Sequence, residues 1–298
     1  DQDDIEPIKM CGVGVAVANG IDDVKIVADS SADVLAIKSV PYASAPLTIR
    51  TTQKEYVDND ALDVAEMVKD LLSNTEKTTT ACPGVGDWID AFGDAKYVFC
   101  VTITSGLSGS YNSAMTAKQN YEETYPDRKV FVIDSLSAGP ELKLIIEKLQ
   151  ELILDQKTYE EICTLIPQYM EHTGLIFTLE SVRNLANNGR VSHLIASAVG
   201  ILGIRILGRA SDQGTLEQLY KCRGEKKALP TLLKMLHDHN FNGKKLRIGH
   251  VFNEQAAIKI KDLVLTDYPD ANIEIYPLRG LCSFYAENGG ILIGFEKE

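Results

Sequence analysis

Short apolar runs alternate with longer amphipathic stretches along the chain from about residue 25 onward. The short runs are bounded by turn residues and predict strands, whereas apolar residues at helical spacing predict helices. The predicted strands cover residues 24–29, 45–49, 97–104, 129–134, 175–179, 216–222, 246–251, 272–277 and 291–295. The predicted helices cover residues 63–74, 141–154, 158–173, 226–239 and 254–268, with a kink or break at Pro167. Alternating strands and helices predict an α/β fold.

One further predicted helix, residues 193–207, is unusually apolar for the surface of a water-soluble protein. A buried core helix is one interpretation of this segment. The wall of an apolar cavity is the other, because small residues such as Ala196, Gly200 and Gly203 leave room along one face. Spacing alone does not distinguish the two interpretations.

Turns rich in hydroxyl groups follow three of the predicted strands, at residues 29–33, 104–110 and 134–139, and a fourth such stretch lies at 78–84. If the strands share one parallel sheet, these turns meet at its carboxyl edge, where ligands bind in such folds. Hydroxyls and free N–H groups at a helix start bind carboxylate or phosphate, although helix capping by serine is the simpler alternative. Without nearby lysine or a GxxxxGK[ST] loop, the turns suit an uncharged or singly charged head group.

Composition narrows the function classes further. The net charge of −12 argues against general nucleic-acid binding, which needs clustered Lys and Arg. No run approaches the roughly 18 apolar residues that a membrane span needs, and the acidic start does not resemble a signal peptide. The six cysteines form no CxxC pair and no zinc-like cluster with histidine. We therefore expect a reduced, cytoplasmic protein without a metal site or disulfide framework.

The residues leave a serine hydrolase and a docking surface as further hypotheses. The chain has no GxSxG motif, and its five histidines lie far in sequence from the serine-bearing turns. A catalytic triad would have to assemble in space, for example through His250. Basic residues cluster at 187–192 and 221–229, and these clusters are either solvated turns or a local docking surface for an anionic partner.

Six motifs in order along the chain resemble the DegV family, the fatty-acid-binding proteins that serve bacterial fatty acid kinases. They are KIVADSSADV (25–34), TTTACPGVGDW (78–88), TSGLSGSYNSA (104–114), VFVIDSLSAGPEL (130–142), NNGRVS (187–192) and KCRGEKKAL (221–229). The resemblance implies two α/β domains with a fatty acid in an apolar tunnel between them. We expect these domains at residues 25–157 and 158–298, with 1–24 as a tail or remnant.

The resemblance also implies residue roles. In the family, a threonine and a serine of two loops hold the fatty-acid carboxylate, and these positions correspond to Thr80 and Ser108, with Ser105 as a neighbour. Basic residues at two further family motifs, here Arg190 and Arg223, are implied docking points for the kinase. The implied protein is a carrier without a cofactor or activity of its own, which presents an acid such as palmitate to the kinase catalytic subunit. A transient membrane contact is compatible with this role.

This sequence departs from the family pattern at three places. Ala81 removes a hydroxyl that is typical of the threonine loop. Near the C-terminus many members carry a histidine beside the carboxylate, whereas Tyr285 falls closest to that position here. A phenol donates the same hydrogen bond but lacks the charge switch of an imidazole.

The third departure is the segment 1–28, which resembles the last motif of haloacid-dehalogenase phosphatases. Asp3 and Asp4 match the metal-binding pair of that motif. The nucleophilic aspartate of such phosphatases is absent, so we expect a remnant, a fusion boundary or a fragment. The sequence as a whole predicts a fatty-acid carrier, with a serine-dependent acyl hydrolase or a carrier of another amphiphilic lipid as the alternatives.

Overall fold

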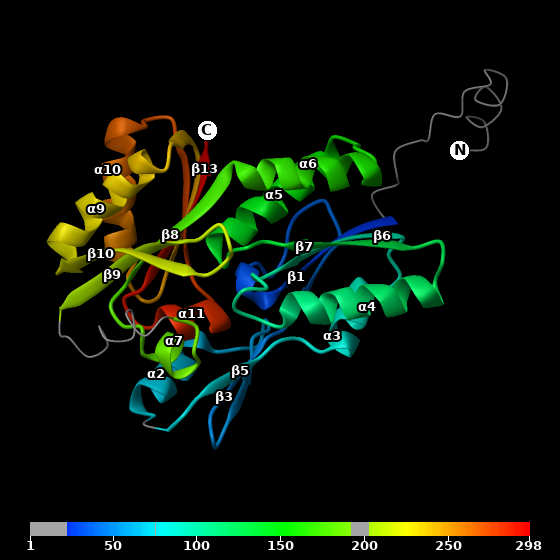
Figure 1. Cartoon of the computed structure of the whole chain (residues 1–298), viewed down its shortest axis with the longest axis horizontal. Helices are drawn as coiled ribbons and strands as arrows, with labels where there is room; N and C mark the ends of the chain where they lie inside the picture. The colour runs from blue at the N-terminus through cyan, green and yellow to red at the C-terminus, as the bar shows by residue number, and fades with distance from the viewer. Residues whose placement is uncertain (1–22, 75, 192–202) are drawn as a thin grey trace.

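The computed structural model describes residues 23–74, 76–191 and 203–298 (Figure 1). Its strands are β1 (Val24–Asp29), β2 (Tyr42–Ala45), β3 (Thr48–Arg50), β4 (Glu55–Val57), β5 (Thr79–Ala81), β6 (Tyr97–Thr102), β7 (Lys129–Asp134), β8 (Thr173–Leu179), β9 (Ile204–Ala210), β10 (Leu216–Arg223), β11 (Phe241–His250), β12 (Asn272–Pro277) and β13 (Ile291–Lys297). Its helices are the 3-10 turn η2 (Ser30–Ala32), α2 (Val64–Ser73), α3 (Val85–Phe92), α4 (Ser110–Thr124), α5 (Pro140–Leu154), α6 (Tyr159–Glu171), α7 (Arg183–Asn187), α9 (Glu225–Asp238), α10 (Glu254–Asp267) and α11 (Gly280–Ala286).

The first sheet is parallel and has the strand order β2-β1-β6-β7. Its central strands are apolar and buried on both faces, as expected for a parallel sheet between helices. In the register, Phe99 of β6 lies beside Ile26 of β1 on one side and Phe131 of β7 on the other. The carboxyl ends of β1, β6 and β7 therefore meet at one edge, which confirms the prediction that their hydroxyl-rich turns are neighbours.

The second sheet has the order β10-β9-β8-β13-β11-β12 and is antiparallel except for the pair β11–β12. Helices α9 and α10 lie together beside it (Figure 1) and bury Leu232, Leu236 and Ile260 in its core. A small antiparallel sheet, β4-β3-β5, completes the fold. The mixed sheets with covering helices confirm the predicted α/β class.

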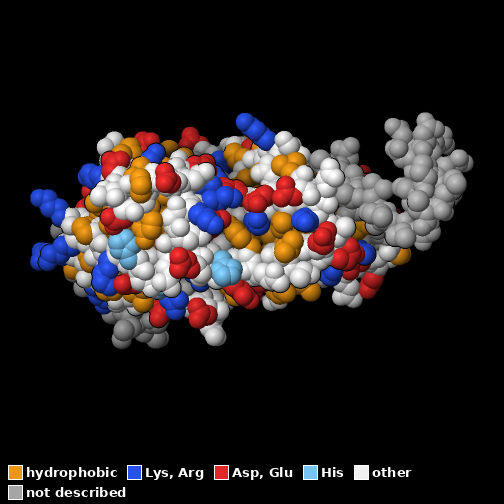
Figure 2. Space-filling view, turned by 90° about the horizontal axis from the view of Figure 1, so that it is seen from above, with side chains coloured by type: hydrophobic (Ala, Val, Ile, Leu, Met, Phe, Trp, Pro, Cys, Tyr) orange, Lys and Arg blue, Asp and Glu red, His pale blue; other side chains and the backbone are white. Residues whose placement is uncertain are grey.

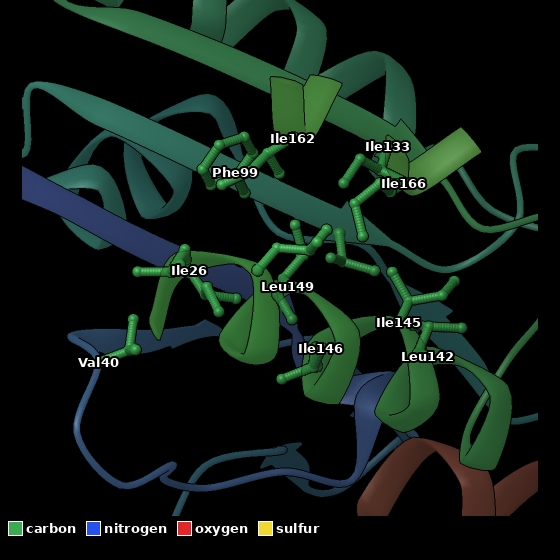
Figure 3. Packing of buried hydrophobic residues seen from close by; sticks show 14 of the residues in the cluster. Ile26, Val40, Phe99, Ile133, Leu142, Ile145, Ile146, Leu149, Ile162 and Ile166 are labelled. Atoms are coloured by element: carbon green, nitrogen blue, oxygen red, sulfur yellow. The ribbon is translucent and has the colours of Figure 1, made fainter. Parts of the chain in front are cut away.

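Helices α5 and α6 cover one face of the first sheet, where Ile145 and Leu149 of α5 pack among Ile26, Phe99 and Ile162 (Figure 3). The amphipathic pattern of α5 thus buries its apolar side, the main source of stability for such a helix. The other face is covered by α3 and α4 through a core that includes Trp88, Phe92 and Tyr121. Because Ile162 of α6 shares the cluster of α5, the domain boundary between residues 157 and 158 stays a prediction.

Helix α5 also joins the two large sheets. A Cβ at Gly294 of β13 would lie 2.6 Å from the backbone carbon of Pro140, so the start of α5 approaches this strand very closely. Arg247 of β11, 5% exposed, donates two 2.7 Å hydrogen bonds to the carboxylate of Glu147 on α5. Burying this bidentate pair of Arg247 and Glu147 fixes the register between the two layers. Charged side chains of both signs gather in the middle of the face seen from above (Figure 2).

The structure corrects several predicted elements and adds others. The predicted strand 45–49 is divided between β2, which ends at Ala45, and β3, which begins at Thr48. Residues 193–202 of the predicted apolar helix lie outside the described residues, and residues 204–207 form part of strand β9 instead. Pairing with β8 and β10 on both sides explains this strand, since isoleucines fit a pleated sheet as well as a helix. Helix α6 continues through Pro167 to Glu171. The short elements β2, β4, β5, α3, α7 and α11 were not predicted.

Two classes of feature are not found among the residues that the structure describes. None of their helices is long and apolar enough to cross a membrane. Nor do three or more potential metal-ligating side chains come together anywhere in residues 23–74, 76–191 and 203–298.

Candidate functional site

A cavity of about 360 Å³ lies where the carboxyl edge of the parallel sheet faces the second sheet. Its size falls within the range of small-molecule sites, which are mostly apolar with a few placed polar groups. The apolar lining comes from both large sheets and the helices between them, and includes Leu47, Ile103, Leu107, Leu136, Leu175, Phe177, Leu179, Leu185, Leu216, Leu281 and Leu292. Such a wall suits a long hydrocarbon ligand.

Polar side chains also line the cavity, among them Thr80, Ser108, Arg190 and Tyr285. The Thr80 Oγ1 and Tyr285 Oη atoms lie 2.7 Å apart and share a hydrogen bond. Arg190 donates from Nε to the carbonyl oxygen of Leu107 at 3.2 Å, beside Ser108. The cavity therefore combines a long apolar wall with hydroxyl donors and one cation, which is the arrangement that an amphiphile with a single negative charge needs.

Each of these side chains is positioned by a different element. Thr80 lies on β5 and is paired with Ile49 of β3. Ser108 lies in the turn between β6 and α4, where its hydroxyl accepts a hydrogen bond from the backbone N–H of Ser110. Tyr285 lies on the last turn of α11, and Arg190 follows α7. The site therefore depends on the packing of elements that are distant in sequence.

Buried Asp29, at the end of β1, holds the turn that carries Ser108. Its Oδ2 accepts hydrogen bonds from the Ile103 N–H at 2.8 Å and the Ser110 hydroxyl at 2.6 Å, while Oδ1 accepts from Ser31. Burial raises the pKa of Asp29, and these hydrogen bonds oppose the rise. On the other side of the turn, the Thr104 hydroxyl donates to the Gly214 carbonyl at 2.9 Å. The turn is thus fixed to both large sheets.

The tyrosine hydroxyl is a hydrogen-bond donor over the physiological pH range. Burial raises the pKa of Tyr285 above its ordinary value, although the hydrogen bond with Thr80 and the charge of Arg190 act in the opposite direction. A protonated phenol beside a threonine hydroxyl offers donors to a carboxylate without burying a second charge. Arg190 supplies a compensating positive charge at the same end of the cavity.

The structure brings Thr80, Ser108 and Tyr285 to one cavity. Ser105 does not line the cavity: its side chain is exposed and its N–H donates to Asp134 at 3.0 Å, because the turn directs Thr104 and Ser108 inward instead. Arg190 lies in the cavity wall, a position that its motif did not reveal. Arg223 is exposed at the end of β10 and is not part of the lining.

A serine hydrolase needs a histidine beside its nucleophilic serine. His250 lies in a separate groove together with Asp33 and Tyr276, and its ring accepts a 3.4 Å hydrogen bond from the Asn253 N–H. Among the described residues, no histidine lines the cavity near Ser108. The described part of the chain therefore does not assemble a serine–histidine pair there.

Buried Asp33 leads to a prediction on stability. Its Oδ1 accepts a 2.8 Å hydrogen bond from the Arg279 N–H, and burial together with the nearby charge of Asp58 raises its pKa from 3.8 to about 8. Between these pH values the folded state binds more protons than the unfolded state, so this group lowers stability as the pH rises. We expect Asp33→Asn, which cannot ionise, to melt higher than the wild type by at least about 2 °C at pH 8.

The same comparison at pH 5 is the control for Asp33→Asn. There the carboxyl is largely protonated in the folded state, so the two melting temperatures should lie close together. Asparagine also tolerates the left-handed backbone at this position, where φ is 56°. A melting-temperature difference that is the same at pH 5 and pH 8 would contradict the raised pKa.

The family model described as "Uncharacterised protein, DegV family" matches residues 23–298. A DegV domain-containing protein of Streptococcus pneumoniae is 42% identical over 276 residues, which cover 91% of this chain and 98% of that protein.

Three solved structures are similar over 92% of this chain. A DegV family protein from Eubacterium eligens loaded with heptadecanoic acid has 45% identity and a TM-score of 0.91, with 100% of that chain covered. The Fatty Acid Kinase (Fak) B3 protein of Streptococcus pneumoniae loaded with linoleic acid has 42% identity and a TM-score of 0.90, with 99% covered. A DegV family protein from Ruminococcus gnavus with vaccenic acid has 28% identity and a TM-score of 0.85, with 99% covered.

Proposed function

The chain belongs to the DegV family, and from this premise we propose that it binds one long-chain fatty acid and presents the carboxylate to a fatty acid kinase. The observation that carries the proposal is the cavity, which has an extended apolar wall and a cluster of Thr80, Ser108, Tyr285 and Arg190. Similar proteins of known structure were loaded with heptadecanoic and linoleic acids. The proposed ligand is an acid of the palmitate class.

The apolar wall supplies most of the affinity in this proposal. Burial of hydrocarbon contributes about 0.8 kcal/mol per CH₂, so a tail of about fifteen carbons contributes on the order of 10 kcal/mol before ordering costs. The far end of the tail meets Leu175 and Ala210, which also line a neighbouring surface groove and thus form the wall at that end of the cavity. Chain length is therefore set at this wall.

The carboxylate lies at the polar end of the cavity, where Thr80, Ser108 and Tyr285 donate hydrogen bonds and Arg190 supplies the positive charge. Hydrogen bonds to a charged group contribute about 1.5–3 kcal/mol each. They fix the orientation of the ligand with its carboxylate toward the loops of the parallel sheet. This orientation leaves the acid group within reach of a partner enzyme.

The phosphoryl donor belongs to the partner and not to this chain. The sequence has no GxxxxGK[ST] loop for a nucleotide, and the described lining of the cavity holds no histidine that would serve a serine nucleophile. Exposed Arg223 is the proposed docking point for the kinase catalytic subunit. The carrier acts in the cytoplasm, and its contact with a membrane is transient.

A reconstituted phosphorylation assay tests the proposal. Palmitate-loaded protein is mixed with ATP, Mg²⁺ and the catalytic subunit of a DegV-dependent fatty acid kinase, and acyl phosphate is trapped with hydroxylamine. We expect acyl hydroxamate only when all components are present. Arg223→Glu should slow the reaction while leaving the palmitate dissociation constant unchanged. Hydroxamate formation without the kinase would instead show that the chain has an activity of its own.

The tyrosine at the family's histidine position leads to a prediction on pH dependence. We expect the wild-type affinity for palmitate to change less than about twofold between pH 5.5 and 7.5, since the phenol does not titrate there. In Tyr285→His, an imidazole with a pKa of about 6.5 becomes charged as the pH falls and should then bind the carboxylate about fivefold more tightly. Titrations at both pH values check this, and an equally flat profile in both proteins would contradict it.

A further inference from the structure

Helix α11 comes late in the chain, yet its first turn is held by two buried aspartates from the early part. Asp58 accepts hydrogen bonds from the Gly280 N–H on Oδ1 at 3.0 Å and from the Leu281 N–H on Oδ2 at 2.9 Å. Asp33 accepts from the Arg279 N–H at 2.8 Å. The first N–H groups of a helix have no partner within the helix, and side-chain oxygens at its start supply one. These aspartates therefore fix the start of α11.

The fit between Asp58 and α11 is tight. Asp58 is 1% exposed, and both of its carboxylate oxygens are used by the helix. A Cβ at Gly280 would lie 2.6 Å from both Cγ and Oδ1 of Asp58, a separation that real Cβ atoms do not show. Glycine at position 280 therefore permits the close approach of the carboxylate to the helix backbone.

Asp58 belongs to the same small sheet that carries Thr80. It follows β4 directly, and β4 and β5 both pair with the central strand β3. The N–H of Asp58 also donates to the Leu47 carbonyl at 2.9 Å, which fixes the residue to the segment before β3. One sheet therefore presents the Thr80 hydroxyl from β5 and holds the start of α11 through Asp58.

Tyr285 lies on the last turn of α11, and its hydroxyl meets Thr80 at 2.7 Å. Phe284 beside it is 1% exposed and packs with Ile49 and Met67, so the helix is also held against β3 and α2 by its side chains. A helix this short transmits a shift of its first turn to its last turn almost unchanged. The distance between the two hydroxyls thus depends on where Asp58 holds the backbone of Gly280 and Leu281.

We propose that Asp58 is a positioning residue for the carboxylate site, which holds α11 so that the Tyr285 hydroxyl meets the fatty-acid head group together with Thr80. The inference rests on the proposed function, since it assigns Asp58 a role in binding the same acid. Asp58 does not touch the ligand; it acts through the backbone of α11. Its effect on affinity therefore requires the hydroxyl of Tyr285.

A double-mutant cycle tests this dependence. Palmitate dissociation constants are measured for the wild type, Asp58→Asn, Tyr285→Phe and the double variant. Asparagine keeps one oxygen acceptor, but its NH₂ group replaces the other oxygen and then faces the N–H of Gly280 or Leu281, to which it cannot bond. We expect Asp58→Asn to weaken palmitate binding about fivefold in the wild-type background and less than about twofold in the Tyr285→Phe background.

Asp63→Asn is the matched control. Asp63 is an exposed cap of the neighbouring helix α2, where its Oδ1 accepts from the Glu66 N–H at 2.9 Å. Its substitution should leave palmitate affinity unchanged. Thermal melting shows whether each variant is folded. If Asp58→Asn is unfolded, the same cycle is measured with Gly280→Ala, whose new methyl group displaces the Asp58 carboxylate.

The outcomes separate this inference from the proposed function. Wild-type protein that does not bind palmitate overturns the proposed function itself. A wild type that binds, with an Asp58 variant that loses the same factor in both backgrounds, shows a general structural role and overturns the positioning role. Unchanged affinity in a folded Asp58 variant overturns it as well. Loss that disappears in the Tyr285→Phe background supports it.

Discussion

Thr80→Ala combined with Ser108→Ala is expected to weaken palmitate binding by at least about 100-fold, since each substitution removes a hydrogen bond of about 1.5–3 kcal/mol to a charged group. The loss of Thr80 also leaves the Tyr285 hydroxyl without its 2.7 Å partner. The carboxylate would then rely on Arg190 and a less well oriented phenol. Fluorescence or calorimetric titration with palmitate measures the change.

Ser105→Ala is the matched control for this pair. Ser105 lies in the same turn as Ser108, but its side chain is exposed and does not line the cavity. Its substitution should leave affinity within about twofold of the wild type. Equal losses for Ser105→Ala and Ser108→Ala, or full affinity in the double variant, would contradict the proposed position of the carboxylate.

Ala210→Phe is expected to weaken palmitate binding by about 100-fold and to shift the preference toward shorter acids. The phenyl ring occupies the room of about four methylenes in the part of the cavity that Leu175 and Ala210 line, where the proposal places the end of the tail. At about 0.8 kcal/mol per CH₂, the lost burial amounts to about 3 kcal/mol. Competition between acids of different length against one fluorescent ligand measures the shift.

Laurate is the internal control for Ala210→Phe. Its shorter tail does not reach the substituted wall, so its affinity should fall less than about fivefold while that of palmitate falls strongly. Comparable losses for both acids would show that the ring blocks the middle of the cavity. That result would contradict the assignment of Leu175 and Ala210 to its far end.

Local hydrophobic pattern was sufficient for several strands, and β1, β7 and β12 have the predicted bounds. Strands β1 and β7 are apolar runs that end at a turn, and β12 alternates polar and apolar residues at the edge of the second sheet. The pattern was not sufficient for β9, whose isoleucines fit a strand or a helix until β8 and β10 pair with it. Short strands such as β5 depend entirely on such pairing.

The sequence also predicted only part of the candidate site. The hydroxyl-rich turns and the family resemblance led to Thr80, Ser108 and Tyr285, which the structure brings to one cavity. The sequence did not distinguish Ser105 from Ser108, since the direction of a side chain within a turn depends on its backbone. It also did not place Arg190 in the cavity wall, because α7 and the Ser108 turn are separated by more than seventy residues.

Native mass spectrometry of the purified protein tests the central claim most directly, when it is followed by denaturing extraction and identification of the bound molecule. The account predicts one fatty acid of about C14–C18 per chain, bound in the cavity that Thr80 and Ser108 line. The double alanine variant should be purified without it. A protein that carries no fatty acid and cannot be loaded with any would contradict the account, and Tyr285 would then mark a changed ligand.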